Sequence, residues 1–192
     1  MAKKLDQIVV IDVESTCWEG APPDGEESEI IEIGVYMLDV ASGERAGQED
    51  ILVRSTHSRV SAFCTGLTTL TQEQVDAGVP FAEACARLQR QYGTKDRVWA
   101  SYGDYDRRQF ERQCAVFGVP YPFGPGHLNV KTLFALVRAL PREVGMDEAL
   151  RMLAVPLEGT HHRAHDDARN IARILSKLLV TARALKKGPM ID

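Results

Sequence analysis

The stretch IVVIDVEST, residues 8–16, carries four apolar residues directly into two carboxylates. A short apolar run of this kind indicates a buried β-strand. Residues two apart in a strand point to the same side, so the side chains of Asp12 and Glu14 should lie close together. Like charges that near are unfavourable unless a proton or a cation lies between them. The stretch therefore predicts a strand whose end carries a candidate cation site.

The composition is that of an ordinary globular domain. The 192 residues are 44% hydrophobic and 26% charged, which excludes a disordered chain. The length predicts a single domain, residues 1–192, with a core at about residues 6–182 and a short C-terminal tail. The formal net charge of −4 excludes a strongly basic, whole-surface nucleic-acid binder. It does not exclude an enzyme that binds the end of a nucleic-acid strand through metals and a few local contacts.

The sequence shows no sign of a membrane or secretory route. Its apolar runs fall short of the roughly 20 residues of a membrane span, and the start MAKKLDQ lacks the apolar region of a signal peptide. The four cysteines are dispersed without CxxC spacing, which is typical of reduced thiols. We therefore expect a cytoplasmic protein with no membrane partner.

Strand patterns come first along the chain, and helical patterns follow. Residues 8–13, 29–40 and 49–54 read as strands, and their short connections predict an antiparallel arrangement. A fourth apolar run, residues 97–103, is compatible with a buried strand. Helices are expected at residues 72–77, 80–92, 104–118, 129–140, 146–153 and 166–187. This order predicts a mixed sheet with helices on its faces.

Carboxylates stand at three ends of these expected elements. Asp12 and Glu14 end the first strand, and SYGDYD places Asp104 and Asp106 between a strand and the next helix. The stretch HHRAHDD, residues 161–167, opens the last helix with three histidines and two aspartates. Each group alone is weak evidence, because exposed acidic pairs and acidic helix starts are common.

Together the groups resemble the DEDDh family of 3′–5′ exonucleases, which has a ribonuclease H-like fold. DVESTC resembles the first motif, Asp-x-Glu, and YGDYDRRQFERQC resembles the second, with an aromatic residue before the aspartate. HHRAHDDARNIARIL is similar to the third, His-x4-Asp followed by Asn-Ile-Ala. AFCTGLTTLTQEQV resembles the ERI-type branch, which includes histone-mRNA exonucleases, although the preceding VRSTHSRVS lacks that branch's prolines.

The resemblance covers residues 6–182 and implies an α/β fold. In such a fold a mixed five-stranded sheet, with its first three strands antiparallel, is flanked by helices. The implied domain is therefore a single exonuclease domain.

The resemblance also selects individual residues. The aspartate that directly follows the aromatic residue is Asp106, which leaves Asp104 as a candidate N-cap of the next helix. The Asp-x-x-Asn-Ile-Ala continuation selects Asp167, and the motif then assigns the general base to His162. His161 precedes Asp166 by the same number of residues as His162 precedes Asp167. The pair His161 and Asp166 therefore stays open as an alternative register.

Two further residues near these motifs have less specific interpretations. His165, like His161, is interpreted as a structural or substrate-contacting neighbour. Glu32 lies on the second expected strand and is interpreted as an exposed carboxylate, with a position in the same site as the alternative.

The selected residues suit phosphodiester hydrolysis. Two divalent cations, Mg²⁺ or Mn²⁺, activate a water and balance the charge on the departing 3′-oxygen, and such hard cations prefer carboxylate oxygens. The resemblance implies that the cations are held by Asp12, Glu14, Asp106 and Asp167. A neutral imidazole then accepts a proton. We expect metal-dependent removal of nucleoside 5′-monophosphates from the free 3′ end of single-stranded RNA or DNA.

Substrate contacts are expected from backbone groups and small residues after Glu14, from an apolar wedge, and from aromatic rings that stack on terminal bases. The residues are Ser15, Thr16, Cys17, Leu67, Leu70, Phe63 and Tyr102. The two leucines are equally well explained as core residues. The acidic charge and the lack of a basic tract predict a shallow footprint of a few nucleotides.

Two other functions stay open at this stage. An HD-type metal phosphohydrolase is suggested by His161, His165 and Asp166, although that fold is wholly helical and the first third of this chain is rich in strands. A non-catalytic module on the exonuclease fold would bind nucleic acid or protein, although all the acidic positions are present. The sequence leaves open the choice between RNA and DNA, between the two metals, and between a monomer and a homo-oligomer.

Overall fold

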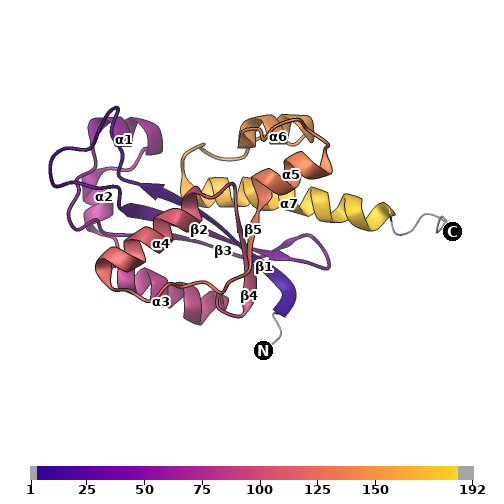
Figure 1. The fold of residues 1–192 in the computed structure, drawn as a ribbon, viewed down its shortest axis with the longest axis horizontal. Helices are drawn as coiled ribbons and strands as arrows, with labels where there is room; N and C mark the ends of the chain where they lie inside the picture. Colours follow the sequence, from indigo (N-terminus) through magenta and orange to yellow (C-terminus); the bar gives the residue numbers. More distant parts are fainter. Residues whose placement is uncertain (1–3, 186–192) are drawn as a thin grey trace.

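The computed structural model describes residues 4–185. Its centre is a five-stranded sheet in the order β3-β2-β1-β4-β5 (Figure 1). The strands are β1 (Lys4–Ser15), β2 (Ile30–Asp39), β3 (Arg45–Leu52), β4 (Arg97–Ser101) and β5 (His127–Asn129). The first three pair antiparallel, and β4 and β5 run parallel to β1. The predicted mixed sheet is confirmed, and the tail expected after about residue 182 lies mostly outside the described residues.

The strand β1 is central because both of its faces are apolar. Val9 and Ile11 pack into one hydrophobic core, whereas Ile8 and Val10 pack into another on the opposite face. A strand that is buried on both sides reads as a continuous apolar run rather than an alternating one. This explains why residues 8–11 are apolar without interruption.

Helices cover both faces of the sheet. Those of the described chain are α1 (Ala62–Thr68), α2 (Gln72–Asp76), α3 (Phe81–Tyr92), α4 (Tyr105–Phe117), α5 (Val130–Val137), α6 (Met146–Met152) and α7 (Ala164–Leu185). The helices α3 and α4 contribute to the core that contains Val9, and α5, α6 and α7 contribute to the core that contains Val10. Figure 1 shows these two groups of helices on different sides of the sheet. No helix within residues 4–185 has the length and apolar character of a membrane span.

Most elements lie where the sequence predicts them. The helix α2 has the expected capping box, in which Thr71 and Gln74 each bond the backbone of the other. The sequence patterns did not locate α1 or β5, which are only 7 and 3 residues long. The strand β5 runs directly into α5, where the side chain of Asn129 accepts the N–H of Thr132 at 3.0 Å. All four cysteines are free thiols.

The helix α7 lies directly against β2. At the contact point a Cβ atom on Gly34 would lie 1.9 Å from the carbonyl oxygen of Ala164, so glycine is what permits this approach. The first turn of α7 is therefore held close to the middle of the sheet. This close approach brings the third motif next to the first.

Candidate active site

The four predicted carboxylates converge on one pocket of about 380 Å³. Asp12 and Glu14 come from β1, Asp106 from the first turn of α4, and Asp167 from the first turn of α7. Oxygen atoms of Asp12, Glu14 and Asp167 lie within 4.8 Å of one another. Three elements that are distant in sequence thus deliver their acidic ends to one place.

A hydrogen bond fixes the second motif to the first. The backbone N–H of Val13, between the two carboxylates of β1, donates to Oδ1 of Asp106 at 3.0 Å. Asp104 does occupy the N-cap position of α4, but its side chain makes no capping hydrogen bond. It lies instead 3.3 Å from a guanidinium nitrogen of Arg107. The N-cap position predicted for Asp104 is therefore confirmed, although its side chain does not cap the helix.

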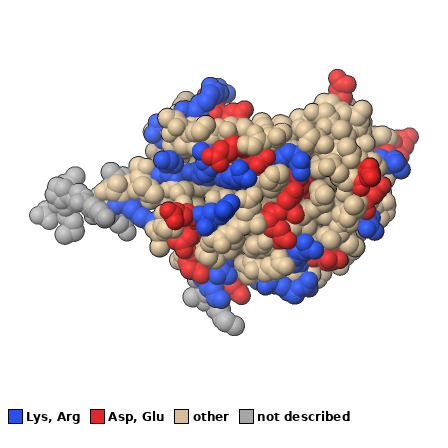
Figure 2. Space-filling view, turned by 180° about the vertical axis from the view of Figure 1, so that it is seen from behind, with Lys and Arg blue, Asp and Glu red and all other residues tan. Residues whose placement is uncertain are grey.

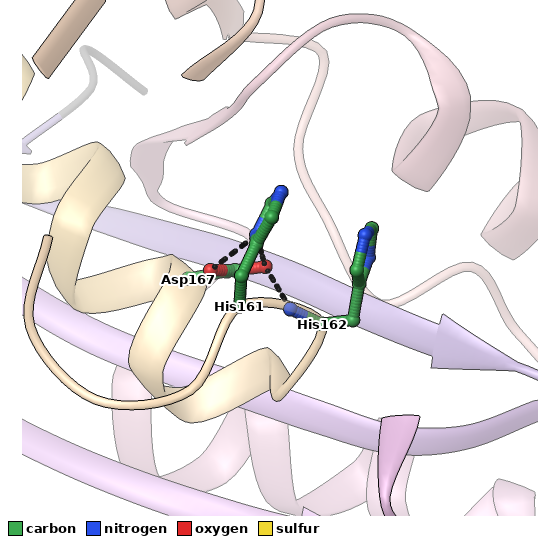
Figure 3. A group of neighbouring side chains, drawn as sticks. All are labelled: His161, His162 and Asp167. Atoms are coloured by element: carbon green, nitrogen blue, oxygen red, sulfur yellow. Dashed lines mark hydrogen bonds and ion pairs between the residues drawn. The ribbon is translucent and has the colours of Figure 1, made fainter. Parts of the chain in front are cut away.

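The third motif forms a compact group at the start of α7 (Figure 3). The carboxylate of Asp167 accepts the backbone N–H of His162 at 2.9 Å and lies 3.0 Å from Nδ1 of His161. Asp166 does not line the pocket, because its carboxylate turns to the N–H of Thr160 at 2.9 Å. Asp167, selected by the motif, is thus the aspartate that faces the other carboxylates.

The two histidines of this group differ in what holds their rings. Their imidazoles stack with centroids 4.0 Å apart, and both line the pocket. One ring nitrogen of His161 is engaged by Asp167, whereas the ring of His162 has no hydrogen-bond partner within residues 4–185. Burial and the adjacent imidazole of His161 lower the pKa of His162, which favours its neutral form. An uncommitted neutral imidazole can accept a proton.

Burial and mutual repulsion raise the pKa values of the carboxylates. Burial, followed by the charges of Asp106 and Glu14, raises the pKa of Asp12 well above its usual range. Burial, with the charges of Asp167 and other neighbours, raises the pKa of Glu14 to about 8. Burial raises the pKa of Asp106 to about 7, although the N–H of Val13 opposes the shift. Burial also raises the pKa of Asp167. Without a cation, this group therefore retains protons near neutral pH.

The donor set fits a hard divalent cation. Within residues 4–185, Asp12, Glu14 and Asp106 form no ion pair with lysine or arginine, so a positive charge has to come from elsewhere. Clustered carboxylate oxygens are the ligands that Mg²⁺ and Mn²⁺ prefer. Asp12, Glu14, Asp106 and Asp167 can hold such ions.

The residues predicted to contact substrate do not all reach the pocket. Ser15, Cys17, Leu67 and Tyr102 line it. Leu70 is 0% exposed and packs in a small core with Ile31, Cys64 and Val75. The substrate contact predicted for Leu70 is therefore wrong, and the alternative interpretation as a core residue applies.

Thr16 and Phe63 also lie outside the pocket lining. The hydroxyl of Thr16 is buried, where it accepts the N–H of Glu29 at 2.9 Å and donates to the carbonyl of Glu27 at 3.2 Å. Its side chain holds a loop and is not available to a substrate, so the prediction is wrong for the side chain of Thr16. Phe63 is 44% exposed and remains accessible from solvent.

Several pocket residues were not predicted as site residues from the sequence. They are Val13, Tyr105, Lys131, Gly145 and Met146. Tyr105 directly precedes Asp106 and follows from the second motif. The others belong to the strand backbone or to the starts of α5 and α6, where no motif marks them. The hydroxyl of Tyr102 donates to the carbonyl of Val144 at 3.0 Å and holds the segment before α6 at the pocket wall.

Glu32 does not have the exposure expected of it. The side chain is fully buried, and in the ladder between β1 and β2 it lies opposite Glu14. Its carboxylate lies 2.6 Å from a guanidinium nitrogen of Arg163. The exposed carboxylate predicted at Glu32 is therefore wrong, and the residue lies next to the pocket without lining it.

Comparison with known families decides the classification. The family model RNase_T, described as an exonuclease, matches residues 9–175. The chain belongs to this exonuclease family. It is 32% identical over 184 residues to 3′-5′ exoribonuclease 1 of Rattus norvegicus and 31% identical to the Homo sapiens protein of the same name. Each alignment covers 91% of this chain but only 53% and 52% of those proteins, so the chain spans about half the length of these relatives.

Solved structures show the same relationship. The nuclease domain of 3′hExo, described as a DEDDh family member bound to rAMP, superposes with a TM-score of 0.85 at 29% identity. The match covers 94% of this chain and 95% of that domain. A structure described as recognition of the histone mRNA stem-loop by 3′-exonuclease gives a TM-score of 0.83 at 28% identity, covering 93% of this chain and 65% of that one. The DEDDh resemblance is confirmed, and the wholly helical HD-type fold is excluded.

The raised pKa values predict how pH affects the stability of the metal-free protein. The folded-state pKa values of Glu14 and Asp106, about 8 and about 7, exceed the unfolded values near 4. Between these limits the folded state binds more protons than the unfolded state, so the free energy of unfolding falls as pH rises. The lowered pKa of His162 acts in the opposite direction but belongs to a single group. We expect the melting temperature in EDTA to fall from about pH 5 to about pH 8.

Two comparisons check this origin of the pH dependence. Asp12→Asn removes one of the repelling charges and should flatten the decline in EDTA. Saturating Mg²⁺ should raise the melting temperature more at about pH 8 than at about pH 5, because the ion binds the deprotonated carboxylates of the folded state. A melting temperature that rises over this pH range in EDTA would contradict the raised pKa values.

Proposed function

We propose that the chain is a metal-dependent 3′–5′ exonuclease that hydrolyses single-stranded RNA or DNA and releases nucleoside 5′-monophosphates. The observation that carries the proposal is the convergence of four carboxylates and an uncommitted imidazole on one pocket. The family supports hydrolysis of nucleic acid, and the rAMP in the 3′hExo neighbour is a mononucleotide of the kind proposed as product. The exoribonuclease names of the relatives favour RNA as a substrate.

The proposed mechanism assigns a task to each group of residues. Asp12, Glu14, Asp106 and Asp167 would hold two Mg²⁺ or Mn²⁺ ions, which when bound activate water and stabilise negative charge on the phosphate. The neutral ring of His162 accepts the proton of the attacking water at a ring nitrogen. His161 is hydrogen-bonded to Asp167 and holds that carboxylate in place. The water oxygen forms a bond to phosphorus, and the bond from phosphorus to the 3′-oxygen of the penultimate nucleotide breaks. That 3′-oxygen takes up a proton, and the phosphate stays on the 5′-oxygen of the released terminal nucleoside.

The volume and lining of the pocket support attack at the end of a nucleic-acid strand. At about 380 Å³ it lies near the lower end of the range for ligand sites, roughly 300–1,000 Å³, which suits one terminal nucleotide. Leu67 from α1, Cys17 just after β1 and Tyr102 just after β4 all line the pocket. These three residues, with Ser15, are the proposed contacts to the terminal nucleotide.

The charge distribution supports a short footprint on the strand. On the face seen in Figure 2, basic and acidic residues are interspersed and do not gather into one basic track. The formal net charge of −4 agrees with this pattern. A protein that contacts few phosphates has weak salt dependence, so binding should weaken only modestly as salt increases.

An assay with labelled oligomers tests the proposed activity. Single-stranded RNA and DNA labelled at the 5′ end should be shortened stepwise with Mg²⁺ or Mn²⁺, with nucleoside 5′-monophosphates as products. EDTA and Asp12→Ala should each abolish turnover, because both remove the cations from the site. A 3′-phosphate should inhibit strongly, since the pocket accepts a strand end.

Controls separate this activity from contamination and from endonuclease cleavage. Glu44→Ala removes an exposed carboxylate and should leave turnover unchanged. A circular single strand should resist degradation. Turnover that persists in Asp12→Ala would refute two-metal catalysis, and binding of the strand without any turnover would favour the non-catalytic module.

The three histidines of the third motif should differ in effect. His162→Ala should slow the chemical step by ~10²–10⁴-fold, the usual range for loss of a general base, and should hardly alter metal affinity. The wild-type rate should rise with pH through the pKa of His162, because only the neutral ring accepts the proton. His161→Ala loses a contact to Asp167 and should cost on the order of tenfold. His165 lies outside the pocket lining, so His165→Ala should retain most activity. A crippled His161→Ala beside a fully active His162→Ala would establish the alternative register.

A further inference from the structure

A carboxylate beside the pocket that accepts three hydrogen bonds has no part in the proposed chemistry. Glu32 is fully buried on β2. One oxygen, Oε1, accepts Nε of Arg163 at 2.9 Å and Nη2 of Arg163 at 2.6 Å. The other, Oε2, accepts the backbone N–H of Ala164 at 2.6 Å. A buried charge with a full set of partners is tolerated, and removal of that charge leaves the partners unsatisfied.

These contacts fall on the segment that carries the proposed base and the last carboxylate. Arg163 directly follows His162, and Ala164 is the first residue of α7. The first N–H groups of a helix lack partners within the helix, and Glu32 supplies one from the neighbouring strand. The carbonyl of Arg163 in turn accepts the N–H of Asp167 at 2.9 Å. The position of Arg163 therefore affects His162 on one side and Asp167 on the other.

The strand β2 also fixes Glu32 relative to the first motif. In the ladder with β1, Glu32 lies opposite Glu14 and Gly34 lies opposite Asp12. Gly34 is where α7 makes its closest approach to the sheet, at the carbonyl of Ala164. Two neighbouring positions of β2 thus set the distance between the carboxylates of β1 and the first turn of α7.

A cation-binding role for Glu32 does not fit the geometry. Ligand atoms of Glu32, Asp50 and His165 do lie within 4.8 Å of one another. The guanidinium of Arg163 lies beside this group, however, 2.6 Å from Glu32 and 3.6 Å from Asp50. Arg163 thus offsets one of the two negative charges there, and both oxygens of Glu32 are already used.

We propose that Glu32 is a positioning residue that, by binding Arg163 and the N–H of Ala164, holds His162 and Asp167 in register with Asp12 and Glu14. The inference rests on the proposed exonuclease function. Glu32 does not line the pocket, so it acts through the turn before α7 and through the first turn of that helix. A small misplacement of reacting groups slows the chemical step far more than it weakens binding of the strand.

Steady-state kinetics of Glu32→Gln test this role. The substitution keeps the shape of the side chain and removes its charge. We expect kcat on a single-stranded oligomer to fall about 10–100-fold, as is usual for groups that orient metal ligands, with KM changed by less than about twofold. Each variant is assayed well below its own melting temperature and at saturating Mg²⁺, with the folded fraction measured by circular dichroism.

Asp50→Asn is the matched control. Asp50 also faces Arg163, but within residues 4–185 it accepts no hydrogen bond from the backbone of α7. Its kcat should stay close to that of the wild-type chain. If Glu32→Gln does not fold, Arg163→Lys is tested in its place. This substitution at a partly exposed position keeps the positive charge but removes the two guanidinium N–H groups that bind Glu32. It should lower kcat in the same direction.

Each outcome has one interpretation. Wild-type kcat in folded Glu32→Gln, or in folded Arg163→Lys where that variant is needed, would overturn the inference. If turnover of Glu32→Gln is low only at limiting Mg²⁺ and equals that of the wild type at saturating Mg²⁺, Glu32 affects metal affinity alone, and the inference would also be overturned. Wild type and Asp12→Ala are measured alongside: an inactive wild-type chain would refute the proposed function itself.

Discussion

Repulsion among three buried carboxylates and one half-buried carboxylate, Asp12, is the constraint to which the rest of the structure responds. Asp12, Glu14, Asp106 and Asp167 would each be more stable in water, and burial beside one another raises the pKa of every one. The hydrophobic cores on the two faces of β1 supply the burial energy that makes this arrangement tolerable. The protein thus holds a group of charges whose mutual repulsion a divalent cation would relieve.

The supports of the site are hydrogen bonds that come from outside the group of carboxylates. The N–H of Val13 binds Asp106, and the N–H of His162 binds Asp167. The contact between Glu32 and Arg163 fixes the turn before α7. The positive charge of Arg163 also opposes the rise in the pKa of Glu14. These donors orient the carboxylates without neutralising them, which leaves their charge available to a cation. Preorganisation of this kind is what a site needs when metal ions and substrate arrive from solution.

Much of this arrangement could be predicted from the sequence. The apolar run before Asp12 and the spacing to Glu14 indicate a strand with two carboxylates on one side, and the later motifs place Asp106 and Asp167 at helix starts. These signals are local, since they depend on the repeat of a strand and the first turn of a helix. They indicate four strands and the candidate acidic groups, whereas the fifth strand and the choice of Asp106 and Asp167 were implied by the resemblance to the DEDDh family.

Burial and long-range contact could not be predicted in the same way. The burial of Leu70, Thr16 and Glu32 depends on which segments pack over them. Strand or helix periodicity does not specify that packing. Glu32 is buried only because α7 crosses β2 at Gly34, more than 100 residues away in the chain. Lys131 lines the pocket because β5, a strand of 3 residues, places the start of α5 beside the pocket. Elements that short carry no detectable pattern.

The central claim is that the carboxylates exchange protons for a divalent cation, and calorimetry tests it directly. Mg²⁺ or Mn²⁺ is titrated into the metal-free protein at about pH 7 in two buffers of different ionisation enthalpy. Because the pKa values of Glu14 and Asp106 are about 8 and about 7, binding should release about one proton or more per chain, and less at about pH 9. Asp12→Asn should weaken the binding. Binding without proton release at about pH 7, or binding of equal strength in Asp12→Asn, would contradict the account.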